Sequence, residues 1–331
     1  PPDENPWIEQ VGACSQTYSE FRRAVRDWYR ASGSLSIEAL NDESLNPGGG
    51  WVSTLCHRPD VAHTVLRSML QPHVDSGLLS IELGWHPVAA KTKGDRVASV
   101  EFRDAQGRRR TVRAPFFVDA TETGELLPMT RTEYVIGAES RRDTGEPHAL
   151  DGDPEPDNVQ GVTWCAVVGY DPSGSHVIEK PAQYDFWRRY QPEGWPCELL
   201  SFFMLHVQRG DVIEFPLFGN EGFNLFSYRQ VVDGSRHGDG REDATVMNWP
   251  MNDYYLGSIL DQTEEVVQEH LEAARQLTLS MLYWLQTEAP RPEGGAGYPG
   301  LRLRPALPGT ATGLAKAPYI RESRRIRAMF T

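Results

Sequence analysis

Cys56 and His57 are the adjacent side chains in this sequence with the clearest capacity for catalysis. They precede Pro59, which begins a predicted helix, and a thiol near a helix N-terminus is expected to have a lowered pKa. A histidine can also transfer protons at neutral pH. The pair is therefore a candidate for redox and proton-transfer chemistry. A buried cysteine beside a histidine that only caps the helix is an alternative that the residues leave open.

Arginines close to the end of the sequence form a second candidate group. Arg321 and Arg324 are predicted to hold or polarise a carboxylate, because the donors of a guanidinium form a fork that matches this group. Arg325 would share a helix face with Arg321, because the two are four residues apart. The alternative is a solvated basic helix that pairs with Glu322 and with the acidic body of the protein.

Residues 116–128, FFVDATETGELLP, predict where a ligand would bind. The apolar run ends at Asp119, and small residues and Gly124 follow. This pattern is typical of a buried strand that enters a tight turn. Ligands of open α/β sheets bind at the carboxyl ends of such strands. An ordinary exit from a strand into a loop is the alternative.

The N-terminal part of the sequence predicts helices at residues 18–30 and 59–76, both with apolar residues at helical spacing. A strand, a three-stranded antiparallel meander and another strand should follow before the turn. The five expected strands are residues 78–83, 85–91, 96–103, 108–113 and 115–119. The first and last of them are expected to be core strands.

The remaining sequence predicts a β-rich region followed by a long helix at residues 264–287, whose apolar residues keep a period of about 3.6. A short aromatic helix is expected at residues 184–190. Residues 248–255 and Trp284 would either line a pocket with aromatic walls and amides or belong to the core. The expected strands are residues 133–138, 162–170, 199–207, 212–218, 223–232 and 245–249.

The composition argues against several classes of partner. The 331 residues carry a formal net charge of −13, which argues against nucleic acid and anionic membrane surfaces. No apolar run approaches the roughly 18 residues of a membrane span. The four cysteines lack C-x-x-C spacing, which predicts a reducing, cytoplasmic location and no zinc site. The histidines likewise show no metal-ligand spacing.

Residues 84–128, GWHPVAAKTKGDRVASVEFRDAQGRRRTVRAPFFVDATETGELLP, resemble the FAD domain of FAD-dependent oxidoreductases of the two-dinucleotide-binding, glutathione-reductase-like kind. LNPGGGWVSTLCHRPDVA, NWPMNDYYLG and GLAKAPYIRESRRIR are similar to the same family, and the resemblance covers essentially the whole chain. It implies a mixed α/β (α+β) fold in three parts. These are a partial FAD-binding Rossmann-like domain with an inserted β-meander in residues 1–130, a mixed-sheet substrate domain in 131–265, and a long helix with a return segment in 266–331.

The resemblance also implies FAD as the cofactor and assigns residues to it. The backbone of Val88 would contact the adenine. Ala120 and Thr121 would lie near the adenosine and pyrophosphate, where small side chains let N–H groups reach phosphate oxygens, and Gly124 would permit the turn. Trp51 and Ser53 would either face the isoalloxazine ring or simply pack within the protein. Gly50, the last residue of a triple glycine, would let the backbone approach the cofactor.

The sequence is expected to lack two parts of this family, the N-terminal GxGxxG unit and the C-terminal part. The strand, GxGxxG turn and helix that hold the pyrophosphate in such proteins are not found. The chain is therefore expected to be the central fragment of an FAD-dependent oxidoreductase that acts on a small organic substrate. One alternative is a flavin-independent carbohydrate-binding or polysaccharide-lyase-like protein that uses Tyr254, His57 and Arg324. Another is a non-catalytic subunit, in a homo-oligomer or completed by a second chain that supplies the missing unit.

Overall fold

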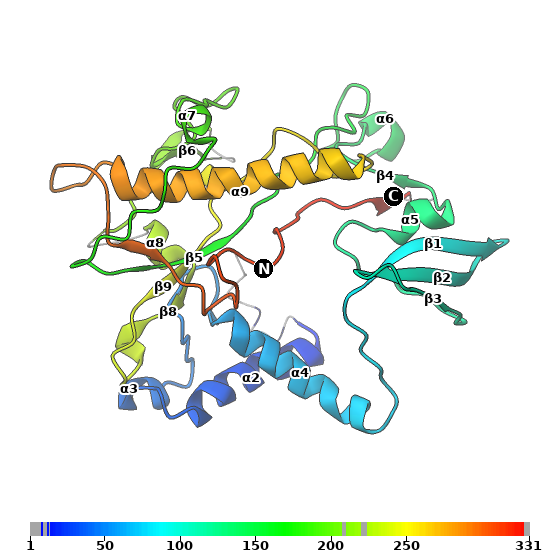
Figure 1. Ribbon diagram of the computed structural model, residues 1–331, viewed down its shortest axis with the longest axis horizontal. Coiled ribbons are helices and arrows are strands. Elements are labelled where there is room, and N and C mark those ends of the chain that lie inside the picture. The colour runs from blue at the N-terminus through cyan, green and yellow to red at the C-terminus, as the bar shows by residue number, and fades with distance from the viewer. Residues whose placement is uncertain (1–7, 9–11, 13, 207–209, 220–223, 328–331) are drawn as a thin grey trace. The chain divides into compact units, whose positions relative to one another are not determined.

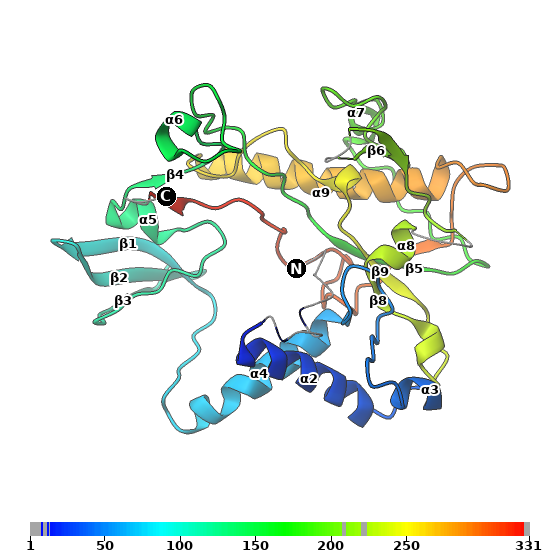
Figure 2. The same ribbon diagram turned by 180° about the vertical axis from the view of Figure 1, so that it is seen from behind.

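The computed structural model describes Ile8, Gly12 and residues 14–206, 210–219 and 224–327, which form two compact units. Unit 1 comprises Pro1–Ser76, Thr163–Asp253 and Ala273–Pro318, and unit 2 comprises Gly77–Val162, Tyr254–Glu272 and Tyr319–Thr331. Figures 1 and 2 show the elements of both units from two sides. The assignment of residues 1–130, 131–265 and 266–331 to cofactor domain, substrate domain and return segment stays a prediction.

Unit 1 begins with the two predicted helices, α2 (Gln16–Ala31) and α4 (Pro59–Asp75). Ser15 caps α2, because its hydroxyl accepts a hydrogen bond of 3.2 Å from the N–H of Tyr18. Pro59 begins α4, where a missing N–H costs no helical hydrogen bond. Both helices are confirmed.

The two helices lie side by side in both views and share one core (Figures 1 and 2). Val25 and Tyr29 of α2 are buried in a cluster with Val61 and Val65 of α4. The Tyr29 hydroxyl accepts a 3.0 Å hydrogen bond from the N–H of Arg58, the residue before α4. Burial raises the pKa of Tyr29 to about 12. This core fixes the connection between the helices, which contains Cys56 and His57.

An antiparallel sheet forms the second part of unit 1. Its strand order is β10-β5-β9-β8. A buried cluster contains Val167, Val232 and Ala244 from these strands together with Leu307, which follows β10. The strands are β5 (Ala166–Tyr170), β8 (Gln230–Val232), β9 (Ala244–Met247) and β10 (Leu301–Leu303).

The long predicted helix is α9 (Glu264–Thr287), and its bounds agree with the predicted ones. Ala274, Leu277, Met281 and Leu285 are fully buried and recur at the helical period, so one apolar stripe holds the helix against unit 1. The residues of α9 that precede Ala273 belong to unit 2.

The short elements of unit 1 include one that corrects the prediction. Residues 223–232 were expected to be a strand, but α8 (Leu225–Tyr228) precedes β8. Asn224 favours the helix because its side chain accepts a 2.8 Å hydrogen bond from the N–H of Ser227. The other short elements are α3 (Ile37–Leu40), α7 (Tyr184–Trp187), β6 (Phe203–Leu205), β7 (Val212–Glu214) and the 3₁₀ turns η1 (Gly234–Arg236) and η2 (Pro250–Asn252).

Unit 2 contains the predicted meander, which is confirmed. Its strands β1 (Trp85–Lys93), β2 (Arg96–Asp104) and β3 (Arg109–Val112) pair antiparallel in chain order. Helix α5 (Leu126–Thr130), at the end of the predicted turn, packs against β1 (Figure 1).

The segment that ends in Arg327 corrects another expectation. A basic helix was one reading of Arg321 to Arg327, but this segment is extended. Residues Arg325–Ile326 form strand β11, which pairs antiparallel with β4 (Tyr134–Val135). Arg321 and Arg325 therefore do not share a helix face. Helix α6 (Arg141–Thr144) follows β4 in the chain.

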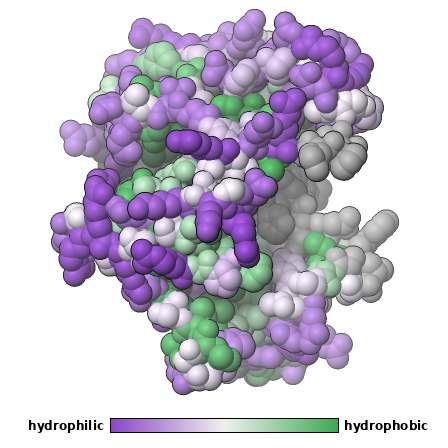
Figure 3. Space-filling view, turned by 90° about the vertical axis from the view of Figure 1, so that its right-hand side faces the viewer, coloured by the Kyte–Doolittle hydropathy of each residue, from purple (hydrophilic) through white to green (hydrophobic). Residues whose placement is uncertain are grey.

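Residues 78–83 and 115–119 are wrong as predicted core strands. Neither segment is a strand, and Leu78, Leu83, Phe116 and Val118 are each more than 80% exposed. A core strand needs a paired neighbour and a covering layer, and none of the described residues supplies either to these segments. Figure 3 shows one face of the molecule, on which hydrophobic groups lie among hydrophilic ones.

The mixed α/β fold class is confirmed, with small antiparallel sheets and one long helix. Among the helices that the structure describes, none combines the length and apolar character required to cross a bilayer.

Candidate functional site

The turn that follows residues 116–118 in unit 2 is organised around the carboxylate of Asp119. One oxygen accepts hydrogen bonds from the N–H and hydroxyl of Thr121, at 3.0 and 2.7 Å. The other accepts one from the N–H of Leu126 at 2.9 Å, at the start of α5. Burial would raise the pKa of Asp119, but these hydrogen bonds outweigh it and lower the pKa below its usual value. The sequence signalled the turn but not this role of Asp119.

Gly124 and Arg324, predicted separately, lie together in this turn. Gly124 has a φ of +66°, and a Cβ there would lie 3.2 Å from the carbonyl oxygen of Arg324. The Arg324 guanidinium donates to the carbonyl oxygen of Thr123 at 2.9 Å and to the Asp261 carboxylate at 2.8 Å. It also lies over the Tyr134 ring, 5.7 Å from the centroid. Arg324 thus holds the turn in place, and its carbonyl oxygen would crowd a side chain at residue 124.

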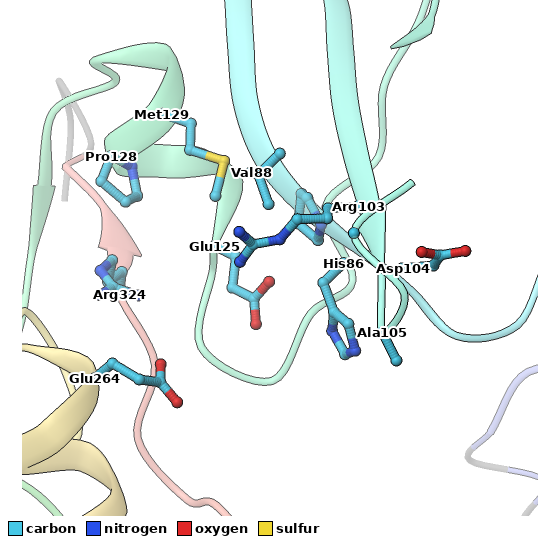
Figure 4. Close-up of a pocket in the computed structure, with 12 residues that line it drawn as sticks. His86, Val88, Arg103, Asp104, Ala105, Glu125, Pro128, Met129, Glu264 and Arg324 are labelled. Atoms are coloured by element: carbon cyan, nitrogen blue, oxygen red, sulfur yellow. The ribbon is translucent and has the colours of Figure 1, made fainter. Parts of the chain in front are cut away.

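A cavity of about 950 Å³ opens beside this turn. We call it the meander cavity, because β1, β2 and the turn that follows β2 supply seven of its twelve lining residues. Figure 4 shows lining side chains from these segments, from the region of α5, from the start of α9 and from the Arg324 segment. Val88 and Arg324 both line it. The β1–β2 register passes from Pro87 to Ala89 and skips Val88, which is therefore a bulge residue on an edge strand. A bulge leaves the extra residue out of the ladder.

Polar and apolar groups divide the wall of the meander cavity. Pro87, Val88, Pro128 and Met129 give an apolar surface. The charged and polar lining side chains are His86, Arg103, Asp104, Glu125, Glu264 and Arg324. Such a mixture suits a flat heteroaromatic ligand with polar edges.

Arg321 and Arg325 are also engaged within unit 2. Arg321 donates to the carbonyl oxygen of Gly161 at 2.9 Å and stacks on the Tyr319 ring. Arg325 forms ion pairs with Glu322 and Glu139 and donates to the Gly137 carbonyl. These contacts attach the extended segment to the unit. The predicted substrate role of Arg321 and Arg324 stays a prediction.

The triple glycine of unit 1 packs against its own chain. A Cβ on Gly50 would lie 2.6 Å from the carbonyl oxygen of Gln230 in β8 and 2.7 Å from the Cys56 sulfur. Asn46, which the sequence did not single out, closes the loop. Its side chain accepts from the Cys56 N–H at 2.7 Å and donates to the carbonyl oxygens of Gly50 and Ser53 at 2.9 and 3.2 Å. The close approach of Gly50 to β8, together with the hydrogen bond from Cys56 to Asn46, therefore positions Cys56.

Cys56 and His57 lie at a second cavity, of about 250 Å³, in unit 1. We call it the Cys56 cavity. The Cys56 side chain is buried, and its sulfur lies 3.6 Å from the Ser53 carbonyl oxygen. His57 Nδ1 lies 2.9 Å from the Leu55 carbonyl oxygen. A carbonyl can only accept, so Nδ1 carries the proton and Nε2 of the neutral ring is the acceptor.

The structure brings together only some of the predicted residues of this loop. Ser53, Cys56 and His57 line the Cys56 cavity. The Trp51 side chain is 55% exposed, and the backbone N–H of Trp51 donates a hydrogen bond to the Tyr228 carbonyl oxygen at 3.0 Å. Val88, Ala120, Thr121 and Gly124 belong to unit 2 and are described with that unit.

Two arginines of the Cys56 cavity were missed. Arg22 is 3% exposed and donates to the Thr54 hydroxyl at 2.8 Å, and Arg229 follows α8. Arg22 had a signal in the sequence, because it lies on the apolar stripe of α2 with Val25 and Tyr29. Asn248, from the predicted aromatic and amide segment, lines the same cavity. Trp249 and Trp284 of the same prediction are buried in the core.

The described residues contain no group of three or more His, Cys, Asp or Glu side chains placed to hold a metal ion. A search of curated proteins and a search of solved structures each returned no match. The family model described as FAD dependent oxidoreductase matches residues 1–331. A match over the whole chain shows the family. The protein therefore belongs to the FAD dependent oxidoreductase family, whose cofactor is FAD.

Proposed function

We propose that this protein takes part in hydride or electron transfer between a small organic substrate and FAD. The family match over residues 1–331 carries this proposal. Bound FAD would supply the redox chemistry itself, since flavins accept and release hydride and single electrons. The contribution of the chain is to hold the cofactor, to orient the substrate and to move protons.

The meander cavity fits the adenosine part of FAD. Its volume of about 950 Å³ is ample, and Val88 offers peptide groups that the β1–β2 ladder does not use. The apolar wall around Val88 and Met129 would cover a face of the adenine, and the polar rim with Arg103 would meet its edge. These residues support the predicted role of Val88.

The turn beside the cavity fits the phosphates less fully. The N–H groups of Thr121 and Leu126 are donated to the Asp119 carboxylate, so they are not open to an incoming anion. The N–H of Ala120 makes no hydrogen bond to another described residue, so it is the donor that the turn still offers. We propose that Ala120 contacts the pyrophosphate and that Asp119 keeps the turn in shape.

The Cys56 cavity is the proposed place of the substrate chemistry. Nε2 of His57 is the acceptor that could take a proton from a bound substrate. Cys56 lies beside it as a thiol that the loop holds in place through Asn46. Trp51 and Ser53 remain proposed contacts of the isoalloxazine ring, and the backbone at Gly50 is proposed to lie close to the cofactor.

Titration of the protein with FAD, followed by flavin fluorescence, tests the cofactor site. Val88→Pro removes the N–H of the bulge residue and should weaken FAD binding by about fivefold, the value of one hydrogen bond. Val88→Ala keeps the N–H and should bind FAD almost as tightly as the unmodified protein. Circular dichroism establishes that both variants keep the meander. If the unmodified protein binds no FAD, or if the two variants bind it equally, the proposed site is wrong.

A further inference from the structure

Arg229 is a cationic side chain of the Cys56 cavity whose Nε finds no hydrogen-bond acceptor among the residues that the structure describes. Its backbone is fixed, because its carbonyl oxygen accepts a 3.1 Å hydrogen bond from the N–H of Val246 in β9. Its guanidinium lies over the Tyr228 ring, 4.9 Å from the centroid. The Nε atom is buried, and among the residues that the structure describes it finds no hydrogen-bond acceptor and no carboxylate.

The surroundings of Arg229 do not compensate its charge. The described residues that line the Cys56 cavity include Arg22 and His57 but no aspartate or glutamate. The lining thus contrasts with the chain as a whole, whose formal net charge is −13. Burial of a guanidinium donor without an acceptor is costly. The late arginines differ from Arg229, because each of three donates a hydrogen bond to an acceptor of unit 2; they are Arg321, Arg324 and Arg325.

We propose that Arg229 binds the carboxylate of a small organic acid in the Cys56 cavity. A carboxylate presents two oxygens in the plane of the guanidinium fork and supplies a negative charge, which the described lining side chains lack. The volume of about 250 Å³ limits the ligand to a small molecule. Phe21, Leu55, Val231 and Val246 form walls for its apolar part. Asn248 lies in the same lining and offers an amide to a second polar group.

As a statement about the substrate class, this inference rests on the proposed function, because it takes the acid to be the molecule that the flavin oxidises or reduces. As a statement about binding, it requires only Arg229 and its cavity. The two are therefore tested separately, and carboxylate binding is measured without FAD.

Calorimetric titration of the protein with benzoate and with pentanoate tests the binding site. Both acids should bind, and benzamide, which has the shape of benzoate without its charge, should bind at least about tenfold more weakly. This comparison uses the unmodified protein and does not depend on a variant that folds. Equal binding of benzoate and benzamide, or no binding of either acid, would overturn the proposal. Tighter binding of inorganic phosphate than of benzoate would also overturn it, since the cavity would then suit a phosphate.

Substitutions of Arg229 test whether this residue binds benzoate. Arg229→Gln should weaken benzoate binding by about tenfold or more, and Arg229→Lys should restore only part of it, because an ammonium lacks the planar fork. Arg23→Gln is the matched control, since it removes the same charge from an exposed position of α2 and should leave binding unchanged. Thermal unfolding establishes that all three variants fold. Loss of benzoate binding in Arg23→Gln as large as that in Arg229→Gln would show a general charge effect and overturn the assignment.

The outcomes of the two proposals are distinguishable. Benzoate binding with no FAD binding would refute the proposed function and leave the carboxylate site intact. FAD binding without benzoate binding would refute the carboxylate site alone.

Discussion

A Cβ on Gly124 would lie 3.2 Å from the carbonyl oxygen of Arg324, two hundred positions further along the sequence. The Arg324 guanidinium donates to the carbonyl oxygen of Thr123, the neighbour of that glycine, at 2.9 Å. This contact ties the turn beside the meander cavity to the segment of unit 2 that comes last in the sequence. It makes the turn sensitive to small changes at residue 124.

Gly124→Ala should destabilise unit 2 by about 1–2 kcal/mol from its positive φ alone. The contact with Arg324 should add to this cost, because backbone atoms cannot move aside cheaply. Gly94→Ala is the matched control, since Gly94 has a φ of +59° and a Cβ there meets nothing within 4 Å. Urea unfolding measures both variants. A cost at Gly124 no greater than that at Gly94 would show that the Arg324 contact is not restrictive.

Unit 2 should lose stability in acid through Asp119. Its pKa is lowered in the folded protein, so its contribution to stability is present above the unfolded value of about 3.9 and is lost as the pH falls through the folded pKa. Asp119→Asn should cost about 1.5–3 kcal/mol at pH 7, because hydrogen bonds to a charged acceptor are weakened. As the pH is lowered, the free energy of unfolding of the Asp119→Asn variant should fall less steeply than that of the unmodified protein. Asp95→Asn, in an exposed turn, is the control, and equal losses in the two variants at pH 7 would contradict this role of Asp119.

The sequence predicted the elements whose signals are local. The helices α2, α4 and α9 and the meander follow from periodicity and turn residues, and all were found close to their predicted bounds. Residues 116–118 show the limit of this approach. A short apolar run has the same appearance whether or not a partner strand covers it, and here Phe116 is 82% exposed.

The candidate site was less accessible from the sequence than the fold. Cys56, His57 and Ser53 were identified because they are adjacent or nearly so along the chain. Arg229 was missed, because its importance depends on the absence of an acceptor in three dimensions, which spacing does not reveal. The contact between Gly124 and Arg324 was missed for the same reason, since it joins two distant segments.

The exposed apolar side chains of unit 2 should be replaceable without loss of stability. Phe116→Ser with Val118→Thr should change the free energy of unfolding by less than about 0.5 kcal/mol, because neither side chain is buried against a described residue. Val25→Ala, in the fully buried core of unit 1, should cost about 1–3 kcal/mol and is the contrasting variant. Urea unfolding compares them.

The same double variant tests the alternative in which a second chain or a second copy completes unit 2. If this surface is covered in solution, Phe116→Ser with Val118→Thr should lower the mass measured by light scattering. A double variant that unfolds as easily as Val25→Ala would show that the two side chains are buried within the chain itself.

His57 should matter for turnover and not for FAD binding. His57→Asn retains a donor where Nδ1 donates to the Leu55 carbonyl oxygen, but it lacks the Nε2 acceptor. If His57 transfers a proton, kcat for flavin reduction should fall by about 10²–10⁴-fold, and the limb of the pH–rate profile that a histidine gives between pH 5 and 8 should disappear. His63→Asn, on an exposed position of α4, should leave both unchanged. A variant of His57 that slows turnover but keeps the pH limb would assign the residue a structural role at the start of α4, because the titrating group would then lie elsewhere.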